Sequence, residues 1–567
     1  MIKILLSKDK FLYDIHSLVK AFYQNEEVQA EIRDDIEETE SRLISNGNSL
    51  IKRLSTDADG QEISIYRSDN NDITIMVRLP EEICEDDAVP HVNDAEAEET
   101  VAVNRINEST NGSDNSVITP KNVIKQALYR LLSEETGREL PWGALTGIRP
   151  TKIATQMIFN GKDDNTIKDY LKTVHYVSGE KADLSIEIAH REREILSRRD
   201  YENGYSLYVG IPFCPTRCSY CSFAAYPLRQ AGHASATHPD RTEYLKTKYA
   251  SMTDRYLACL EKELRATAEM MRGTRLDTVY IGGGTPTSLS VAQLNRLLKF
   301  LRQEFDFSAV QEFTVEAGRT DSILDDIGKL PLLLDYGVDR ICVNPQTFVQ
   351  RTLDIIGRDH TTEQVNEAFH LARDAGFTNI NMDIILGLPG EAQEDVALTM
   401  RQIAKLAPDD LTVHSLALKR GSRMHAALTE SAGAAAPDAV VPPADAPMLM
   451  WKIAEEGARE MGLQPYYLYR QKNMTGNMEN VGFARPGKEG LTNILGMEEV
   501  HSILACGAGA ITKRVWNVPE GDPHFGLIRR AANVKELEAY LARVDEMIER
   551  KQALFSRTTP PLPASAI

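Results

Sequence analysis

Short apolar runs and longer amphipathic stretches alternate regularly through the middle of the chain. Strand-like apolar runs occur at 205–210, 277–282, 312–317, 339–344, 379–386 and 410–418. The stretches between them have helical periodicity, at 242–271, 289–304, 321–336, 362–375 and 394–407. This alternation predicts an α/β fold with a parallel sheet covered by helices. Six such units are too few for a complete eight-unit barrel of ~250 residues, so we expect an open or partial barrel.

The regions that flank this core have different patterns. Two strand-like runs near the start, 62–68 and 72–80, predict a small α+β domain. The segments expected in chain order are an N-terminal accessory α+β domain at 1–87, an acidic linker at 88–117, helices leading into the core at 118–200, the core at 201–429, an Ala/Pro-rich linker or insert at 430–447, a mostly helical C-terminal region at 448–555 and a disordered tail at 556–567.

The composition is that of an ordinary globular protein. The chain has 567 residues and a formal net charge of −19 at pH 7, which argues against general binding to nucleic acid or anionic membranes. No apolar run reaches the ~18 residues needed to span a bilayer, and we expect a cytoplasmic protein. The seven cysteines are sparse and odd in number, which speaks against a disulfide framework.

Three of these cysteines, Cys214, Cys218 and Cys221, stand in GIPFCPTRCSYCSF, directly after the first core strand. A structural zinc site usually needs four ligands, and the nearest histidines, His233 and His238, lie outside this segment. A redox pair would need only two cysteines. Three thiolates suit a 4Fe–4S cluster with one iron left open to a ligand. The spacing therefore favours a cluster.

Polar residues or glycines stand at the ends of the other core strands, where parallel barrels gather their site residues. In chain order they are Gly282, Gly283, Gly284, Thr285, Glu316, Asn344, Gln346, Asp383, His414, Ala417 and Lys419, with Arg358 in a following loop. Consecutive glycines let a ligand approach the backbone closely. A polar side chain on an apolar strand costs stability unless it is paired, so this recurrence predicts a site.

Two features leave alternatives open. The segment 142–150, with Trp142, Gly143, Gly147, Arg149 and Pro150, predicts an unusual loop before a helix. A structural turn is the simpler interpretation, and an anion-binding loop using Arg149 and Lys152 is the other. The remaining cysteines are interpreted as small core hydrophobes, with Cys506, in the glycine-rich ACGAGA, kept open as a functional residue; they are Cys84, Cys259, Cys342 and Cys506.

With these motifs the chain resembles radical S-adenosylmethionine (radical SAM) enzymes. The three cysteines match that superfamily's cluster motif, and GGGTPT matches its SAM-binding glycine strand. More narrowly, YVGIPFC, YIGGGTPT, NPQTF, IGRDH and DIILGLPGE resemble the oxygen-independent coproporphyrinogen III oxidase group. WGALTGIRPTK and PYYLYRQKNMTGNMENVGF resemble its HemZ-type members. The resemblance covers roughly 120–530 and implies a radical SAM partial (β/α)6 barrel.

The resemblance also implies roles for single residues. The cluster would sit on Cys214, Cys218 and Cys221, and Gly283, Gly284 and Thr285 would hold the methionine amino group of SAM. The other positions that match SAM-contacting residues are Tyr208, Tyr220, Glu316, Gln346, Arg358, Asp383 and Ala417. The implied reaction uses a 5′-deoxyadenosyl radical and a reducing donor such as flavodoxin or ferredoxin. It converts two propionates of coproporphyrinogen III to vinyl groups in heme biosynthesis.

One departure from the oxidase pattern keeps other functions open. The oxidases carry a fourth cysteine two positions after the third, where this chain has Phe223, as the related heme chaperones do. A heme-binding chaperone, with His501 or Met474 as candidate axial ligands, is therefore the second hypothesis. Another tetrapyrrole-modifying radical SAM enzyme is the third. The candidate partners for an anionic tetrapyrrole are Arg470, Lys472, Arg485 and Lys488, followed by Arg149 and Lys152.

Overall fold

The structure is a computed structural model of the chain. It describes residues 1–9, 11–23, 26–46, 48–56, 61–79, 100–102, 119–201, 203–223, 225–228, 239–417, 419, 421–424, 426, 446–471, 474–517 and 526–556. Most of the expected acidic linker, most of the Ala/Pro-rich insert and nearly all of the expected tail lie outside these residues, as do Cys84, His233, His238 and Lys472. None of the described helices is long and apolar enough to cross a membrane.

The chain divides into two compact units, and their bounds differ from the segments expected from the sequence. The first unit takes in the described residues within 1–91, 107–191 and 468–479. The second takes in those within 92–106, 192–467 and 480–567. The expected accessory domain is therefore only part of the first unit, because helices after residue 118 and a short segment near residue 470 pack into the same body.

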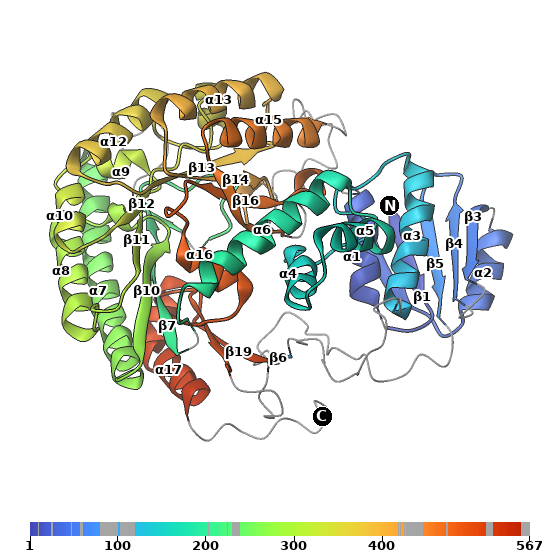
Figure 1. Ribbon diagram of the computed structural model, residues 1–567, viewed down its shortest axis with the longest axis horizontal. Coiled ribbons are helices and arrows are strands. Elements are labelled where there is room, and N and C mark those ends of the chain that lie inside the picture. Colours follow the sequence, from blue (N-terminus) through green and yellow to red (C-terminus); the bar gives the residue numbers. More distant parts are fainter. Residues whose placement is uncertain are drawn as a thin grey trace. The chain divides into compact units, whose positions relative to one another are not determined.

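The first unit contains a five-stranded sheet in the order β2-β1-β5-β4-β3 (Figure 1). Its elements are β1 (Ile2–Leu6), α1 (Leu12–Phe22), β2 (Val28–Ile32), α2 (Ile36–Ser45), β3 (Ser49–Thr56), β4 (Gln61–Arg67) and β5 (Ile73–Arg78). Apolar residues of α1 and of the later helix α3 (Pro120–Thr136) share one hydrophobic cluster with β1, β4 and β5. The two strands expected at 62–68 and 72–80 are β4 and β5.

The rest of the first unit is helical, as expected for 118–200. Its helices are α3, α4 (Thr151–Phe159), α5 (Asp164–His175) and α6 (Gly179–Ser197), the last of which ends in the second unit. The loop 142–150 precedes α4, and a Cβ on Gly143 would lie 2.0 Å from the carbonyl oxygen of His175. Buried Glu479 accepts hydrogen bonds from Trp142 Nε1 (2.7 Å) and Lys181 Nζ (2.5 Å). The two HemZ-type segments therefore meet in this unit.

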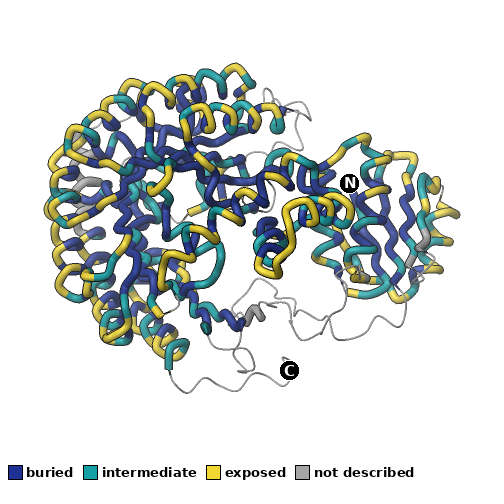
Figure 2. The backbone as a smooth tube through the Cα atoms, in the orientation of Figure 1, coloured by how far each residue is buried: buried dark blue, intermediate teal, exposed yellow. Residues whose placement is uncertain are grey.

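The second unit is built on the expected parallel sheet. The six strands are β7 (Gly204–Ile211), β10 (Arg275–Gly283), β11 (Glu312–Glu316), β12 (Arg340–Cys342), β13 (Ile380–Leu386) and β14 (Asp410–Ser415). They pair in parallel in chain order. Their residues are mostly buried, whereas the surrounding helices carry exposed residues on their outer faces (Figure 2). The apolar runs predicted these strands because both faces of the sheet are covered.

Helices connect these strands along the outside of the sheet (Figure 1). They are α7 (Pro239–Met270), α8 (Val291–Glu304), α9 (Thr320–Leu324), α10 (Lys329–Asp335), α11 (Gln350–Ile355), α12 (Thr362–Ala375) and α13 (Gln393–Leu406). The single helix expected at 321–336 is two helices. Gly328 caps the second of them, and Pro331 falls in its first turn, where a missing N–H is tolerated.

The C-terminal region corrects one expectation, because strands alternate with its helices. It contains α15 (Ala446–Glu460), β15 (Gln464–Tyr469), β16 (Asn480–Ala484), α16 (Leu491–Glu498), β17 (Ser502–Cys506), β18 (Ile511–Val515), β19 (Leu527–Ala532) and α17 (Leu537–Phe555). β17 pairs in parallel with β7, and β16 pairs antiparallel with β14. The short segment β6 (Thr100–Ala102), inside the expected linker, pairs with β19. These strands extend both edges of the core sheet to twelve strands.

Candidate functional site

The cysteine loop is fixed by the strands beside it. The loop follows β7, and its first residues form β8 (Phe213–Cys214), which pairs with β9 (Tyr226–Pro227). The amides of Gly284 and Thr285, at the end of β10, donate to the carbonyls of Ile211 and Phe213, both at 2.7 Å. The carboxyl end of β10 therefore holds the start of the loop in place.

The glycines of the GGG segment are required by this close packing. A Cβ on Gly284 would lie 2.4 Å from the carbonyl oxygen of Phe213, which is too close for any side chain. Gly283 has φ of 106°, a left-handed conformation that favours glycine. A Cβ on Gly282 would meet the Glu316 carboxylate at 2.9 Å. Packing against β7 and β11 thus accounts for all three glycines, whether or not a ligand also lies against them.

The three cysteines differ in their exposure to water. Cys218 is buried, and Cys214 and Cys221 are partly exposed. Burial of the thiol raises the pKa of Cys214 to about 12 and also raises the pKa of Cys221. Cys214 Sγ lies 3.7 Å from Thr285 Oγ1. The neutral thiols of Cys214 and Cys221 are thus favoured in the free protein, and iron would have to displace their protons on binding.

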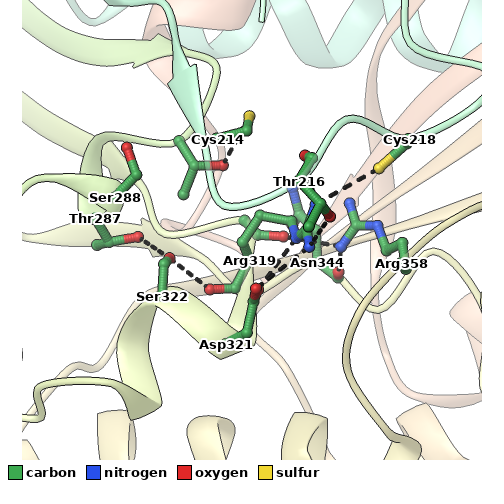
Figure 3. Close-up of polar contacts among 12 residues, drawn as sticks. Cys214, Thr216, Cys218, Thr287, Ser288, Arg319, Asp321, Ser322, Asn344 and Arg358 are labelled. Atoms are coloured by element: carbon green, nitrogen blue, oxygen red, sulfur yellow. Dashed lines mark hydrogen bonds and ion pairs between the residues drawn. The ribbon is translucent and has the colours of Figure 1, made fainter. Parts of the chain in front are cut away.

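Sequence reasoning missed Arg319, which lies in the loop after β11. Its side chain is buried and donates to Thr216 in the cysteine loop, to Asp321 and, at 3.7 Å, to Cys218 Sγ (Figure 3). The only signal in the sequence is its place three residues after Glu316, at a strand end. Nothing in the local pattern relates it to a cysteine about 100 residues earlier.

Glu316 ends β11 and is linked to two tyrosines. Tyr280 Oη donates to Glu316 Oε1 at 2.7 Å, and the Tyr280 and Tyr208 rings stack with centroids 6.0 Å apart. Burial raises the pKa of Glu316 to about 7, with Tyr280 acting in the opposite direction. The structure therefore brings two predicted site residues, Tyr208 and Glu316, together through Tyr280, which sequence reasoning did not single out.

Asp383, in β13, is held by donors from three strands or strand ends. Asn344 Nδ2 and Asn381 Nδ2 donate to its two carboxylate oxygens, both at 2.7 Å, and His414 Nε2 lies 3.8 Å away. Burial by itself raises the pKa of Asp383, but the contacts with His414 and Asn381 outweigh it, and the pKa is lowered. A carboxylate that is ionised and oriented in this way can accept hydrogen bonds from a ligand.

Arg358 and Gln346 lie close to these groups. Arg358 Nη1 donates to the carbonyls of Gly318 and Asn344 at 3.0 and 2.8 Å, and Nη2 lies 3.5 Å from Tyr220 Oη. Gln346 has φ of 66° and bridges to Ile384 in β13. Ala417 follows β14 and is partly exposed. Contacts between side chains and backbone groups thus connect the predicted positions at the ends of β10, β11, β12 and β13, whereas Ala417 is placed only by the strand that it follows.

The donor set fits a cofactor, because several buried polar atoms have no partner. Among the described residues, Gln346 Oε1, Asn344 Oδ1 and Arg358 Nε are buried without a hydrogen bond, which is costly unless a ligand or water satisfies them. Within the same residues, no three His, Cys, Asp or Glu side chains are placed to hold a metal ion. Three cysteines spread along one loop suit a multi-iron cluster better than a single ion.

Several secondary candidates are placed away from this site or are already engaged. Arg485 N bonds to the carbonyl of Asp409, and Lys488 contacts Thr378, so both lie at the amino ends of the strands. Arg470 is buried and donates to backbone carbonyls of Leu145 and Asn477 in the first unit. These three residues were candidate partners for an anionic substrate; the side chains of Arg470 and Lys488 contact other residues of the chain, whereas Arg485 is placed by its backbone amide.

The candidate heme ligands are also engaged. His501 is fully buried, with Nδ1 2.9 Å from Ser206 Oγ and Nε2 3.2 Å from Asp277 without a hydrogen bond. Met474 is buried, and its sulfur accepts from the amide of Gln471. Cys342 and Cys506 are buried as expected, and Cys506 Sγ lies 3.2 Å from Lys551 Nζ. The role of Arg149 and Lys152 in anion binding stays a prediction.

Comparisons with known proteins identify the family of this chain. Residues 208–403 match the Radical SAM superfamily. The chain is 37% identical over 448 residues to the oxygen-independent coproporphyrinogen-III oxidase-like protein HemZ of Bacillus subtilis (strain 168), covering 77% of this chain and 82% of that protein. It is 34% identical over 212 residues to the heme chaperone HemW of the same organism, covering 37% of this chain and 50% of HemW.

The oxygen-independent coproporphyrinogen III oxidase of Escherichia coli (strain K12) is 33% identical over 216 residues, or 38% of this chain and 42% of the oxidase. A solved structure of coproporphyrinogen III oxidase (HemN) from Escherichia coli superimposes with a TM-score of 0.45 and 25% identity, over 61% of this chain and 70% of that one. From the HemZ likeness, which covers most of both chains, this chain belongs to the radical SAM, oxygen-independent coproporphyrinogen III oxidase-like family, whose enzymes use a 4Fe–4S cluster and S-adenosylmethionine.

Proposed function

We propose that this protein is a radical SAM oxidoreductase that converts two propionate side chains of coproporphyrinogen III to vinyl groups, giving protoporphyrinogen IX. The observation that carries the chemistry is the meeting of the cysteine loop with polar strand ends at one edge of the parallel sheet. The choice of a tetrapyrrole substrate is supported by the HemZ likeness, which spans 82% of a protein named for its similarity to the oxidase.

In this proposal Cys214, Cys218 and Cys221 bind the cluster, which with SAM supplies one-electron chemistry when bound. Glu316 and Asp383 accept hydrogen bonds from SAM, and Arg358 braces the backbone of Gly318 and Asn344 beside it. The remaining residues proposed to line SAM are Tyr208, Tyr220, Gly283, Gly284, Thr285, Gln346 and Ala417.

In each round of the proposed reaction a propionate would lose one hydrogen atom, CO₂ and one electron, and become a vinyl group. SAM, consumed as a co-substrate, would take up the hydrogen atom. One electron from a donor such as flavodoxin or ferredoxin cleaves each SAM, yielding methionine and 5′-deoxyadenosine. The substrate electron leaves to an acceptor. Two rounds consume two SAM molecules.

The second candidate function is heme binding, as in the chaperone relatives. Phe223 favours it, because this exposed side chain stands where the oxidases have a fourth cysteine; it is 61% exposed. The likeness to HemW and the likeness to the E. coli oxidase are nearly equal in identity and length, so neither decides between the two functions. His501 and Met474 are both buried, so neither side chain is open to an added heme in this structure.

The test is an anaerobic assay of the reconstituted full chain with dithionite, SAM and coproporphyrinogen III, followed by mass spectrometry. Formation of protoporphyrinogen IX with 5′-deoxyadenosine is the expected result. The control is C214S/C218S/C221S, which should form neither product. The F223C variant restores the oxidase pattern at an exposed position. Turnover by F223C alone, or tight heme binding by the wild type without turnover, would favour the chaperone function.

A further inference from the structure

One buried guanidinium, that of Arg319, fastens the cysteine loop to the end of β11. Arg319 and its partner Asp321 both have side chains that are less than one-tenth exposed. The Arg319 head group donates from Nη1 to the Thr216 carbonyl at 3.0 Å and from Nη2 to Thr216 Oγ1 at 2.8 Å. Thr216 lies between the first two cysteines, so these bonds fix the part of the loop that spaces them.

The same guanidinium contacts a cysteine directly. Nη1 also donates to Cys218 Sγ at 3.7 Å, while Nε and Nη2 donate to the Asp321 carboxylate at 3.1 and 3.3 Å (Figure 3). All three nitrogens of the Arg319 guanidinium therefore donate hydrogen bonds. One side chain can reach all of these acceptors because the guanidinium is planar and has donors on three sides. A lysine ammonium keeps the charge but cannot reproduce the set.

A fixed positive charge and an N–H···S hydrogen bond at a ligating sulfur favour the reduced form of an iron–sulfur cluster, because reduction adds negative charge. Asp321 lies on the far side of the guanidinium and partly offsets its charge. Arg319 and Asp321 together therefore set the electrostatic potential at Cys218 Sγ. Thr216 and Cys218 accept from the same nitrogen, which couples the shape of the loop to this electrostatic effect.

We propose that Arg319 is a positioning residue for the cluster: it holds the cysteine loop in shape for taking up iron and sulfide, and it makes the bound cluster easier to reduce. This inference rests on the proposed binding of the cluster by Cys214, Cys218 and Cys221. It adds a residue that contacts a ligating sulfur and does not depend on which tetrapyrrole, if any, is the substrate.

The experiment compares the full-length wild type with R319Q, R319K and D321N after anaerobic reconstitution. The control is R296Q. It removes a bidentate ion pair between Arg296, on α8, and the carboxylate of Glu261, on α7. Iron and sulfide content report uptake, and a redox titration followed by electron paramagnetic resonance reports the midpoint potential. Neither readout needs substrate or turnover.

We expect R319Q to take up less cluster than R296Q and to be harder to reduce. At the wild-type midpoint the ratio of reduced to oxidised cluster should fall about tenfold, which is 59 mV for a one-electron couple. R319K should lower uptake but keep the potential near that of the wild type. D321N should raise the potential, because it removes the offsetting negative charge and leaves the donor in place.

Uptake and potential equal to the wild type in R319Q would overturn the inference and leave the proposed function standing. A D321N potential that is unchanged or lower would overturn the electrostatic half of the inference. If R319Q takes up no cluster while it melts like R296Q, the positioning role is supported, and R319K and D321N still report the potential. A wild type that takes up no cluster would overturn both the inference and the proposed function.

Discussion

Glu316 gives the site a pH-dependent stability, because burial raises the pKa of its carboxyl from 4.5 to about 7. Between these values the folded protein holds a proton that the unfolded chain has lost, so the free energy of unfolding falls as pH rises through this window. E316Q cannot ionise. We expect wild-type stability to fall relative to E316Q by up to ~1.4 kcal/mol per pH unit between pH 4.5 and 7.

Urea unfolding of the cofactor-free proteins at several pH values would measure this difference. E367Q, which changes an exposed carboxylate on α12, is the control and should follow the wild type at every pH. Parallel stability curves for the wild type and E316Q would contradict the expectation and would mean that Glu316 has the same pKa in the folded and unfolded states.

Single residues differ in how far the sequence alone could assign them. The three cysteines could be found because their spacing is itself the chemical signal, and Glu316 and Asp383 could be found because a carboxylate on an apolar strand is conspicuous. Tyr280 and Arg319 could not. In the sequence Tyr280 is one of several apolar or aromatic strand residues, and only the structure shows its hydroxyl 2.7 Å from Glu316. The role of Arg319 depends on its contact with a cysteine loop about 100 residues away in the sequence.

The pairing of β7 with β10 makes a glycine at position 284 a structural requirement. The G284A Cβ would lie 2.4 Å from the carbonyl oxygen of Phe213, in backbone that carries the cysteine loop. Relief would have to move the loop, and overpacking of this kind costs about 1–3 kcal/mol. We expect G284A to lower the midpoint of urea unfolding and the iron content after reconstitution.

The matched control is G496A, in α16, where an added Cβ would make only ordinary contact, 3.7 Å from the nearest atom. It should retain both stability and iron uptake. Equal iron content in G284A and G496A would show that the loop tolerates displacement and that the close approach is not needed for the site.

Elements could be predicted where burial on both faces left a continuous apolar run. The six core strands met that condition. β16 and β17 were harder to recognise, because NVGFA contains a glycine and SILAC is a short apolar run that fits a helix as well as a strand. Their strand conformation comes from pairing with β14 and β7, which are more than 60 residues away in the sequence.

The division of the whole molecule could not be derived from composition, because composition marks linkers and not packing partners. Residues 88–117 look like a boundary, yet helix α3, which follows them, belongs to the same hydrophobic cluster as β1, β4 and β5. Segment 468–479 returns to the same unit after the whole core and is tied there by Glu479. A segment that packs against a distant part of the chain in this way has no distinguishing pattern in its own sequence.

This packing predicts the effect of removing residues 1–117. An autonomous accessory domain could be deleted with little effect on the rest. In this structure the deletion would strip partners from apolar residues of α3, namely Ile124, Ala127, Leu128, Leu131 and Leu132, all of which are at most 5% exposed. At ~25 cal/mol per Å² of apolar surface, exposing five such side chains costs several times the ~1 kcal/mol of an average point substitution.

We therefore expect the shortened protein to aggregate or to melt at a markedly lower temperature than the full chain. L128A in the full chain provides a second measurement that does not depend on recovering the fragment. Leu128 is fully buried, and its truncation should cost about 2–5 kcal/mol. If the unit unfolds as one body, L128A will lower the free energy of unfolding of residues 1–79 and of α3 by the same amount, as measured by hydrogen exchange. If residues 1–79 keep their protection in L128A, they fold independently of α3, and the expected accessory domain is restored.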